Sequence, residues 1–175
     1  GVTVVVSPLI ALQRDQAHAI DGQDVGSAAV LNSTLGKGAR EQTLADLENG
    51  EIEFLFLAPE QLANAETLAR VQAARPSLFV VDEAHCISAW GHDFRPDYLN
   101  LGAAIAALGH PRVLALTATA APPIRQEIVE RLGMHNPVIL VQGFDRPNID
   151  LRVEGVAEKA RKHEALLAQV QAAAK

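Results

Sequence analysis

Cysteine is nearly absent from this 175-residue chain, and its scarcity limits the sites that the protein can contain. With a single cysteine the chain forms no internal disulfide and no zinc site built of cysteines alone. No apolar stretch approaches the ~20 residues that a membrane helix needs, and no secretory signal pattern opens the chain. We therefore expect a protein of the reducing cytoplasm with no membrane partner.

Positive charge is also in short supply. The chain has 15 Lys and Arg against 21 Asp and Glu, a formal net charge of -6 and a sequence pI of about 5.5. This balance argues against a protein that holds nucleic acid through bulk positive charge. The densest cationic stretch, residues 159–163, is typical of a solvated helix face. Any contact with nucleic acid is therefore expected to be local, through loops and helix ends.

Aromatic residues are few and unevenly placed. The only Trp, the only Tyr and one of the 5 Phe fall in residues 90–98, which read Trp-Gly-His-Asp-Phe-Arg-Pro-Asp-Tyr. Flat rings interleaved with cations are typical of a surface that stacks bases and holds phosphates. Trp90, Phe94 and Tyr98 are also spaced four apart, as on one buried helix face. The glycine and the proline between them argue against a continuous helix.

An apolar run, residues 78–81, stops at two adjacent carboxylates, Asp82 and Glu83. A short run of this kind is typical of a strand that is buried on both faces. Carboxylates at the carboxyl end of such a strand lie at the sheet edge, where open α/β folds place their ligands. The same two residues would also suit the first turn of a following helix. Spacing alone leaves both interpretations open.

Strand-like and helix-like stretches alternate along the chain. Short apolar or β-branched runs predict strands at residues 2–6, 28–31, 54–57, 78–81, 113–116 and 138–141, with an edge strand at 149–153. Helices are predicted at residues 9–20, 38–47, 59–71, 98–108, 122–132 and 159–174. Ser7 is expected to cap the first helix, with Pro8 in its first turn. This alternation predicts an α/β fold with a mostly parallel sheet and helices on both faces.

Parallel strands all end on one edge of a sheet, and the helices that follow them begin there. Four segments are therefore expected along one rim, namely residues 7–8, 59–60, 82–83 and 117–119. Helix amino ends point their free amides and positive dipoles outward from such a rim. We therefore expect a phosphate-rich ligand along it.

Residues 82–98 read Asp-Glu-Ala-His-Cys-Ile-Ser-Ala-Trp-Gly-His-Asp-Phe-Arg-Pro-Asp-Tyr. This run resembles motif II and the aromatic-rich loop of the RecQ family of DNA helicases, and its length makes the match specific. Residues 5–16, 58–60 and 115–120 resemble the family's motifs Ia, Ib and III, in the same order along the chain. Residues 144–149 are similar to the segment that closes the family's first motor domain.

The resemblance implies a partial RecA-like ATP-binding domain at residues 1–153 and a connecting helix at 154–175 toward a second motor domain. It implies an ATP-dependent helicase that unwinds DNA from 3′ to 5′ in recombination and repair, associated with the nucleoid if bacterial. ATP and Mg²⁺ are the implied cofactors, with no zinc in this stretch. Single-stranded DNA and duplex junctions are the implied partners.

The resemblance also assigns roles to residues on the rim. Asp82 would hold Mg²⁺ through water, Glu83 would be the catalytic base, and His85 would couple hydrolysis to DNA. Thr117 and Thr119 would relay between the two sites, and a role in capping the helix at residue 122 is compatible with that relay. Arg95 would pair with a phosphate or with a neighbouring carboxylate. The residues expected to contact DNA are Ser7, Pro8, Pro59, Glu60, Trp90, Phe94 and Arg95.

One family feature is missing from the sequence. No Gly-x-x-x-x-Gly-Lys-Ser/Thr run occurs in the chain, and residues 35–38 have the wrong spacing and read as a turn. We therefore expect a fragment that is inactive alone and part of an active enzyme in the full-length protein. The alternative is a degenerate module that binds nucleotide or nucleic acid without catalysis. An RNA helicase is disfavoured by the aromatic-rich loop.

Overall fold

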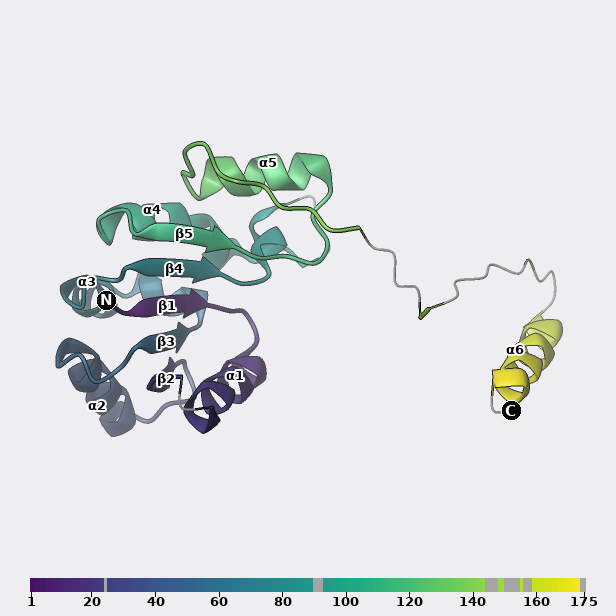
Figure 1. Ribbon diagram of the computed structural model, residues 1–175, viewed down its shortest axis with the longest axis horizontal. Coiled ribbons are helices and arrows are strands. Elements are labelled where there is room, and N and C mark those ends of the chain that lie inside the picture. The colour runs from purple at the N-terminus through teal and green to yellow at the C-terminus, as the bar shows by residue number, and fades with distance from the viewer. Residues whose placement is uncertain (24, 90–92, 144–147, 150–154, 156–158, 174–175) are drawn as a thin grey trace. The chain divides into compact units, whose positions relative to one another are not determined.

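The computed structural model describes residues 1–23, 25–89, 93–143, 148–149, 155 and 159–173. These residues divide into two compact units, Gly1–Pro137 and Val138–Lys175, which are described separately (Figure 1). The predicted domain boundary at residue 153 falls outside the described residues, so that assignment stays a prediction.

A five-stranded parallel sheet forms the centre of the first unit, in the order β2-β3-β1-β4-β5. The strands are β1 (Thr3–Val6), β2 (Ala28–Leu31), β3 (Phe54–Leu57), β4 (Leu78–Val81) and β5 (Arg112–Ala115). Strands β3 and β4 supply buried residues to both faces of the sheet, whereas β1 buries Val4 and Val6 on one face and leaves its other face partly exposed. The predicted α/β class and parallel sheet are confirmed.

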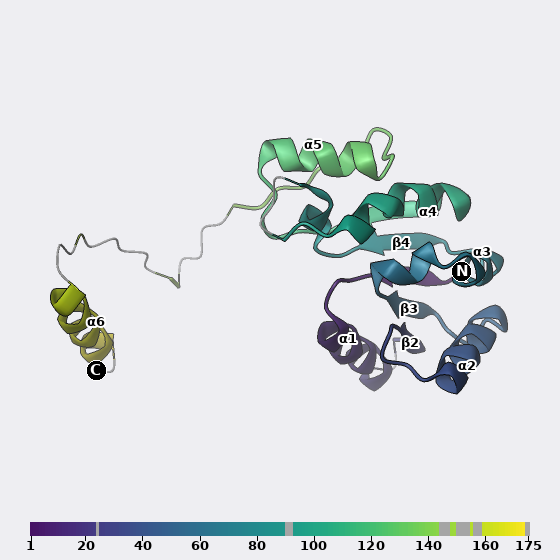
Figure 2. The same cartoon turned by 180° about the vertical axis from the view of Figure 1, so that it is seen from behind.

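Helices connect the strands. The α-helices are α1 (Ile10–Gly22), α2 (Lys37–Glu48), α3 (Ala65–Ala73), α4 (Leu101–Ala107) and α5 (Pro122–Arg131), and the short 3₁₀ helices are η1 (Pro59–Ala63), η2 (Ala84–Ile87) and η3 (Pro96–Asn100). The crossover to β2 runs opposite to the later ones, so right-handed connections put α1 on one face and α2, α3 and α4 on the other. Helix α4 lies behind β5 in Figure 1 and in front of it in Figure 2.

The strand register aligns the carboxyl ends of the sheet. Val6 pairs with Leu57 and Val81, Leu57 pairs with Leu31, and Val81 pairs with Ala115. The residues that follow these ends therefore share one edge, which we call the carboxyl edge. It carries residues 7, 32, 58, 82 and 116, so the predicted rim exists.

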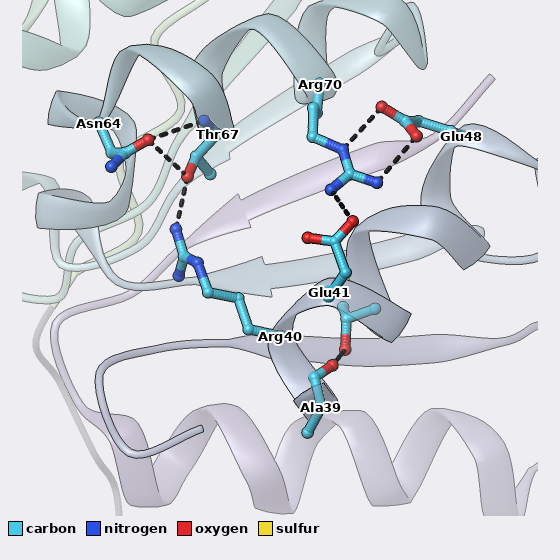
Figure 3. Close-up of polar contacts among 8 residues, drawn as sticks. Ala39, Arg40, Glu41, Glu48, Asn64, Thr67 and Arg70 are labelled. Atoms are coloured by element: carbon cyan, nitrogen blue, oxygen red, sulfur yellow. Dashed lines mark hydrogen bonds and ion pairs between the residues drawn. The ribbon is translucent and has the colours of Figure 1, made fainter. Parts of the chain in front are cut away.

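Polar contacts join α2 to α3 on the face of the sheet that these two helices cover (Figure 3). The Arg40 guanidinium donates to Thr67 Oγ1 at 2.5 Å and also to Gln61. Arg70 donates to Glu48 at 2.7 and 2.9 Å and to Glu41 at 2.7 Å. These contacts hold the two helices beside each other, and none of them involves Asp82 or Glu83, the carboxylates that follow β4.

One predicted helix start is wrong, and one predicted helix is interrupted. Helix α1 begins at Ile10 with Leu9 as its N-cap, so Ser7 caps nothing. The predicted helix 59–71 is two elements, because the Asn64 side chain accepts from the Thr67 amide at 2.9 Å and starts α3 anew. Pro59 does begin a helix, the 3₁₀ helix η1.

The second unit contains α6 (Lys159–Ala173), close to the predicted helix. Its described cationic residues, Arg161, Lys162 and His163, are exposed, as a solvated face requires. The strand predicted at residues 138–141 is wrong, since these apolar residues are exposed and form no strand. A strand exists only where a neighbour completes its backbone hydrogen bonds, and this segment has none in the described part of the chain. The predicted edge strand 149–153 lies mostly outside the described residues.

Candidate functional site

Asp82 lies at the carboxyl edge, immediately after β4. Its amide donates to the Val6 carbonyl at 2.9 Å, which extends the pairing of β4 with β1 by one residue. The Ser7 hydroxyl donates to Asp82 Oδ2 at 3.0 Å, and the Glu83 amide donates to Asp82 Oδ1 at 3.0 Å. Each carboxylate oxygen is therefore oriented by one donor and keeps further lone pairs for other ligands.

Tyr98 also holds Asp82 in place. Its side chain is 0% exposed, and its hydroxyl donates to the Asp82 carbonyl oxygen at 3.0 Å. Burial raises the pKa of the Tyr98 phenol well above its ordinary value, with the nearby Cys86 and Asp82 adding to the effect. The expectation that Tyr98 shares a base-stacking surface is therefore wrong, because the ring is a core anchor for the carboxylate turn.

Glu83 has an unusual backbone conformation. Its φ of 47° and ψ of 45° are left-handed, and its side chain makes no capping hydrogen bond to η2. A residue with a side chain is strained there and needs its surroundings to hold it. The surroundings include the Ala84 amide, which donates to the Leu116 carbonyl at 2.9 Å. The helix-capping interpretation of Asp82 and Glu83 is wrong, because neither carboxylate caps η2.

His85 joins the carboxylates to the loop after β5. Its Nδ1 lies 3.1 Å from Glu83 Oε2 and 3.0 Å from Thr117 Oγ1, while its Nε2 lies 3.7 Å from Asp93 Oδ2. Thr117 Oγ1 also accepts from the Thr119 amide at 3.3 Å. The N-cap of α5 is Ala121, so neither threonine caps that helix, and the predicted capping role is wrong.

The aromatic-rich loop returns to the edge beside the segment after β1. Phe94 is 37% exposed, and the Arg95 guanidinium donates to the Pro8 carbonyl oxygen at 3.4 Å. Among the described residues Arg95 forms no ion pair with a carboxylate, and its pairing with a phosphate stays a prediction. The Arg95 amide donates to the Cys86 carbonyl at 2.9 Å and ties the loop to η2. Trp90 lies outside the described residues.

The other predicted DNA contacts differ in accessibility. Ser7 is 0% exposed, its hydroxyl is used by Asp82, and its amide donates to the Leu57 carbonyl at 3.2 Å. The Ser7 hydroxyl is thus used by Asp82 and the Ser7 amide by β3, which argues against the expected contact between Ser7 and DNA. Pro59 is buried, whereas Pro8 and Glu60 are half-buried. The two prolines have no amide hydrogen to offer.

Two residues that the sequence interpretation missed belong to this edge. Gln13 Nε2 donates to the Ser7 carbonyl oxygen at 2.7 Å, and Asn32 Nδ2 donates to Gln13 Oε1 at 3.4 Å. The sequence contained one sign of the role of Gln13. Gln13 stands four residues before Ala17, so both residues lie on the buried face of α1. A long polar side chain at a core position needs a buried hydrogen-bond partner.

The residues around Asp82 fit a magnesium ion that arrives with a phosphate ligand. Mg²⁺ keeps much of its water shell and binds through one or two carboxylates plus substrate phosphates. Asp82 offers one oriented carboxylate, and no group of three or more His, Cys, Asp or Glu in the described residues could hold a metal alone. Cys86 is a buried free thiol, and burial raises its pKa. In the described part of the chain, no helix has the length and apolar character needed to cross a bilayer.

Comparison with known proteins identifies the family of this chain. Residues 1–127 match the DEAD/DEAH box helicase family. The probable ATP-dependent DNA helicase RecS of Bacillus subtilis is 44% identical over 162 residues, which are 93% of this chain and 32% of the relative. The ATP-dependent DNA helicase RecQ of Pasteurella multocida is 38% identical over 149 residues, 85% of this chain and 23% of the relative. The chain thus spans about a third or less of these proteins.

Solved structures agree on the fold alone. The Hef helicase domain of Pyrococcus furiosus has a TM-score of 0.56 at 20% identity and covers 77% of this chain, which covers 28% of it. The DUF1998 helicase MrfA, bound to DNA and AMPPNP, has a TM-score of 0.58 at 15% identity, with coverages of 75% and 19%. The parallel sheet, the acidic pair and the relatives lead to one conclusion: this chain belongs to the DEAD/DEAH box helicase family, and its relatives are helicases of the RecQ and RecS type.

Proposed function

We propose that this chain is part of the first motor domain of an ATP-dependent DNA helicase of the RecQ type. The whole protein would use ATP hydrolysis to unwind DNA from 3′ to 5′ in recombination and repair, in the cytoplasm. Its DNA substrate would be single-stranded DNA and the junction where a duplex opens. The single observation that carries the proposal is the pair of oriented carboxylates, Asp82 and Glu83, joined through His85 to Thr117.

The nucleotide chemistry follows from the residues of the carboxyl edge. Bound Mg²⁺ would neutralise charge on the ATP phosphates. Asp82, oriented by Ser7 and Glu83, would accept hydrogen bonds from the ion's water shell. Glu83 would orient the attacking water and take its proton. His85 lies within 3.1 Å of Glu83, so a change at the phosphate site can reach Thr117 through the imidazole.

The DNA side would lie on the aromatic-rich loop. Phe94, exposed in part, and Trp90 would stack on bases without choosing sequence. Pro8 and Glu60 would border the DNA backbone, and Arg95 would steady the loop through Pro8. The hydrogen bond from Arg95 to Pro8 supports a role in which the loop and the segment after β1 move together.

The test is hydrolysis by a full-length protein that contains this chain, with and without single-stranded DNA. Glu83→Gln keeps the side-chain size and removes the base, so hydrolysis should fall by about 10²-fold or more while ATP still binds. Glu41→Gln, on α2, is the matched control and should retain wild-type hydrolysis. Full activity in Glu83→Gln would refute the assigned role.

The degenerate module remains the competing hypothesis, and it has a simple discriminator. A Gly-Lys-Ser/Thr loop encoded upstream of Gly1 would favour the enzyme, and a coding sequence without one would favour the module. The relatives from Bacillus subtilis and Pasteurella multocida are named as ATP-dependent DNA helicases, which favours the enzyme.

A further inference from the structure

A group of buried polar side chains, Ser7, Gln13 and Asn32, lies along the carboxyl edge. Ser7 and Gln13 are 0% exposed and Asn32 is 2% exposed. Burial of an apolar side chain carries no cost from lost hydrogen bonds to water. Burial of a polar side chain destabilises the fold unless hydrogen bonds within the protein replace those to water. The hydrogen bonds of these three residues therefore need an account.

The hydrogen bonds connect the three residues to Asp82 in one line. From Asp82 Oδ2 the line passes to the Ser7 hydroxyl at 3.0 Å. It continues from the Ser7 carbonyl to Gln13 Nε2 at 2.7 Å, and from Gln13 Oε1 to Asn32 Nδ2 at 3.4 Å. The last bond is the longest and hence the weakest, so a small shift of the loop after β2 changes it first.

The outer end of this line reaches solvent. Asn32 Oδ1 accepts from the Thr34 amide at 3.0 Å and from the Thr34 hydroxyl at 2.7 Å. The Thr34 hydroxyl accepts from Arg14 Nη2 at 2.5 Å. Thr34 and Arg14 are exposed, and Arg14 takes part in none of the ion pairs formed among the described residues. The line therefore joins a surface cation to the carboxylate after β4.

The sheet topology explains how a helix residue completes this line. Asn32 follows β2 and Ser7 follows β1, and β3 lies between these two strands. Helix α1 packs against β2 and β3, so it carries Gln13 across the end of β3. Gln13 is long enough to bond on both sides, and its amide has both a donor and an acceptor to do so.

We propose that Gln13 and Asn32 are positioning residues, which hold Asp82 in its orientation and make that orientation depend on the loop at residues 32–34. This inference rests on the proposed function, because Asp82 matters to catalysis only if it serves ATP. Gln13 fixes the Ser7 carbonyl and so aims the Ser7 hydroxyl at Asp82. A DNA phosphate at the Arg14 guanidinium shifts Thr34 and Asn32 and thereby changes the longest bond of the line.

The test compares two identical substitutions in a full-length protein that contains this chain. Gln13→Leu breaks the line of hydrogen bonds. Gln61→Leu is the control, because it removes a side-chain amide from another buried position, where the amide oxygen accepts from Arg40. ATP hydrolysis is measured across a Mg²⁺ titration, with and without single-stranded DNA. Thermal denaturation of each variant verifies folding.

We expect Gln13→Leu to raise the Mg²⁺ concentration for half-maximal hydrolysis and to lower the stimulation by DNA, each by about tenfold, as for the loss of one buried hydrogen bond. Gln61→Leu should change both by less than about twofold. Because members of one network are not independent, Ser7→Ala added to Gln13→Leu should cost little more than Gln13→Leu alone.

A further variant keeps the proposal testable if Gln13→Leu does not fold. Asn32→Asp keeps the acceptor for Thr34 and removes the donor to Gln13, so it should also lower stimulation by DNA. If the wild type is active, two results would overturn the proposal for Gln13 and Asn32. One is an equal change in Mg²⁺ dependence and DNA stimulation in Gln13→Leu and Gln61→Leu. The other is that the effects of Ser7→Ala and Gln13→Leu multiply in the double variant. A wild type without ATP hydrolysis would overturn the proposed function and this inference with it.

Discussion

Removal of the Tyr98 hydroxyl is expected to change both the stability of the protein and the dependence of that stability on pH. The hydroxyl is buried and donates to the Asp82 carbonyl at 3.0 Å. Tyr98→Phe leaves the ring in place and leaves the carbonyl without this donor. The loss of one buried hydrogen bond predicts a decrease of about 1–2 kcal/mol in the free energy of unfolding at neutral pH.

The pH dependence has a definite sign. Burial raises the pKa of Tyr98 in the folded state, so the folded protein keeps the phenol proton when the unfolded chain has lost it. The stabilisation is complete below the unfolded pKa of about 10 and is lost as pH rises beyond it, by about 1.4 kcal/mol per pH unit from this group. Tyr98→Phe lacks that slope, so the difference between wild type and variant should close about one pH unit above that pKa.

The assay is chemical denaturation at a series of alkaline pH values, with the ultraviolet absorption of tyrosinate as a second readout. Tyr98 is the only Tyr in the sequence, so the absorption reports this residue alone. Tyrosinate should appear together with the loss of secondary structure. Tyrosinate that appears at the ordinary pKa while the protein is still folded would refute the buried anchor, as would equal pH slopes in wild type and variant.

Three further predictions concern separate parts of the molecule. Arg70 lowers the pKa of Glu48 by hydrogen bonding, so Arg70→Gln should return the Glu48 pKa toward its ordinary value in an NMR titration. The variant should also lose the stability that this contact provides at neutral pH and that the wild type loses on acidification. An unchanged Glu48 titration would contradict this contact. Thr117→Val removes the hydroxyl beside His85, so stimulation of hydrolysis by DNA should fall severalfold in a full-length protein, and an unchanged ratio would count against the relay. The purified 175-residue chain should not hydrolyse ATP or unwind DNA, and measurable turnover would disprove that prediction.

The parallel sheet could be predicted because its strands are short apolar runs bounded by turn residues. The bounds of β2, β3 and β4 agree with the sequence interpretation. Residues 138–141 have the same apolar character and form no strand, since composition does not reveal whether a neighbouring strand is present. The position of Asp82 could also be predicted. A residue that directly follows a buried strand of a parallel sheet lies at the carboxyl edge of that sheet.

The contacts within the site depended on information that spacing does not contain. Ser7 looked like a helix cap, yet its hydroxyl bonds Asp82, which is 75 residues away and brought close by the pairing of β1 with β4. Tyr98 and Phe94 belong to the same four-residue spacing, but one is buried and the other is 37% exposed. The left-handed backbone of Glu83 is likewise set by tertiary contacts, since glutamate has no intrinsic preference for it.

The central claim is that the acidic pair and the aromatic-rich loop act as one nucleotide- and DNA-responsive unit. Its most direct test is the rate of ATP hydrolysis by a full-length protein carrying Trp90→Ala or Phe94→Ala, measured with and without single-stranded DNA. Hydrolysis in the presence of DNA should fall strongly while hydrolysis without DNA falls little, because loss of a stacked base weakens binding by about 1–3 kcal/mol. An equal loss of both rates would contradict the claim.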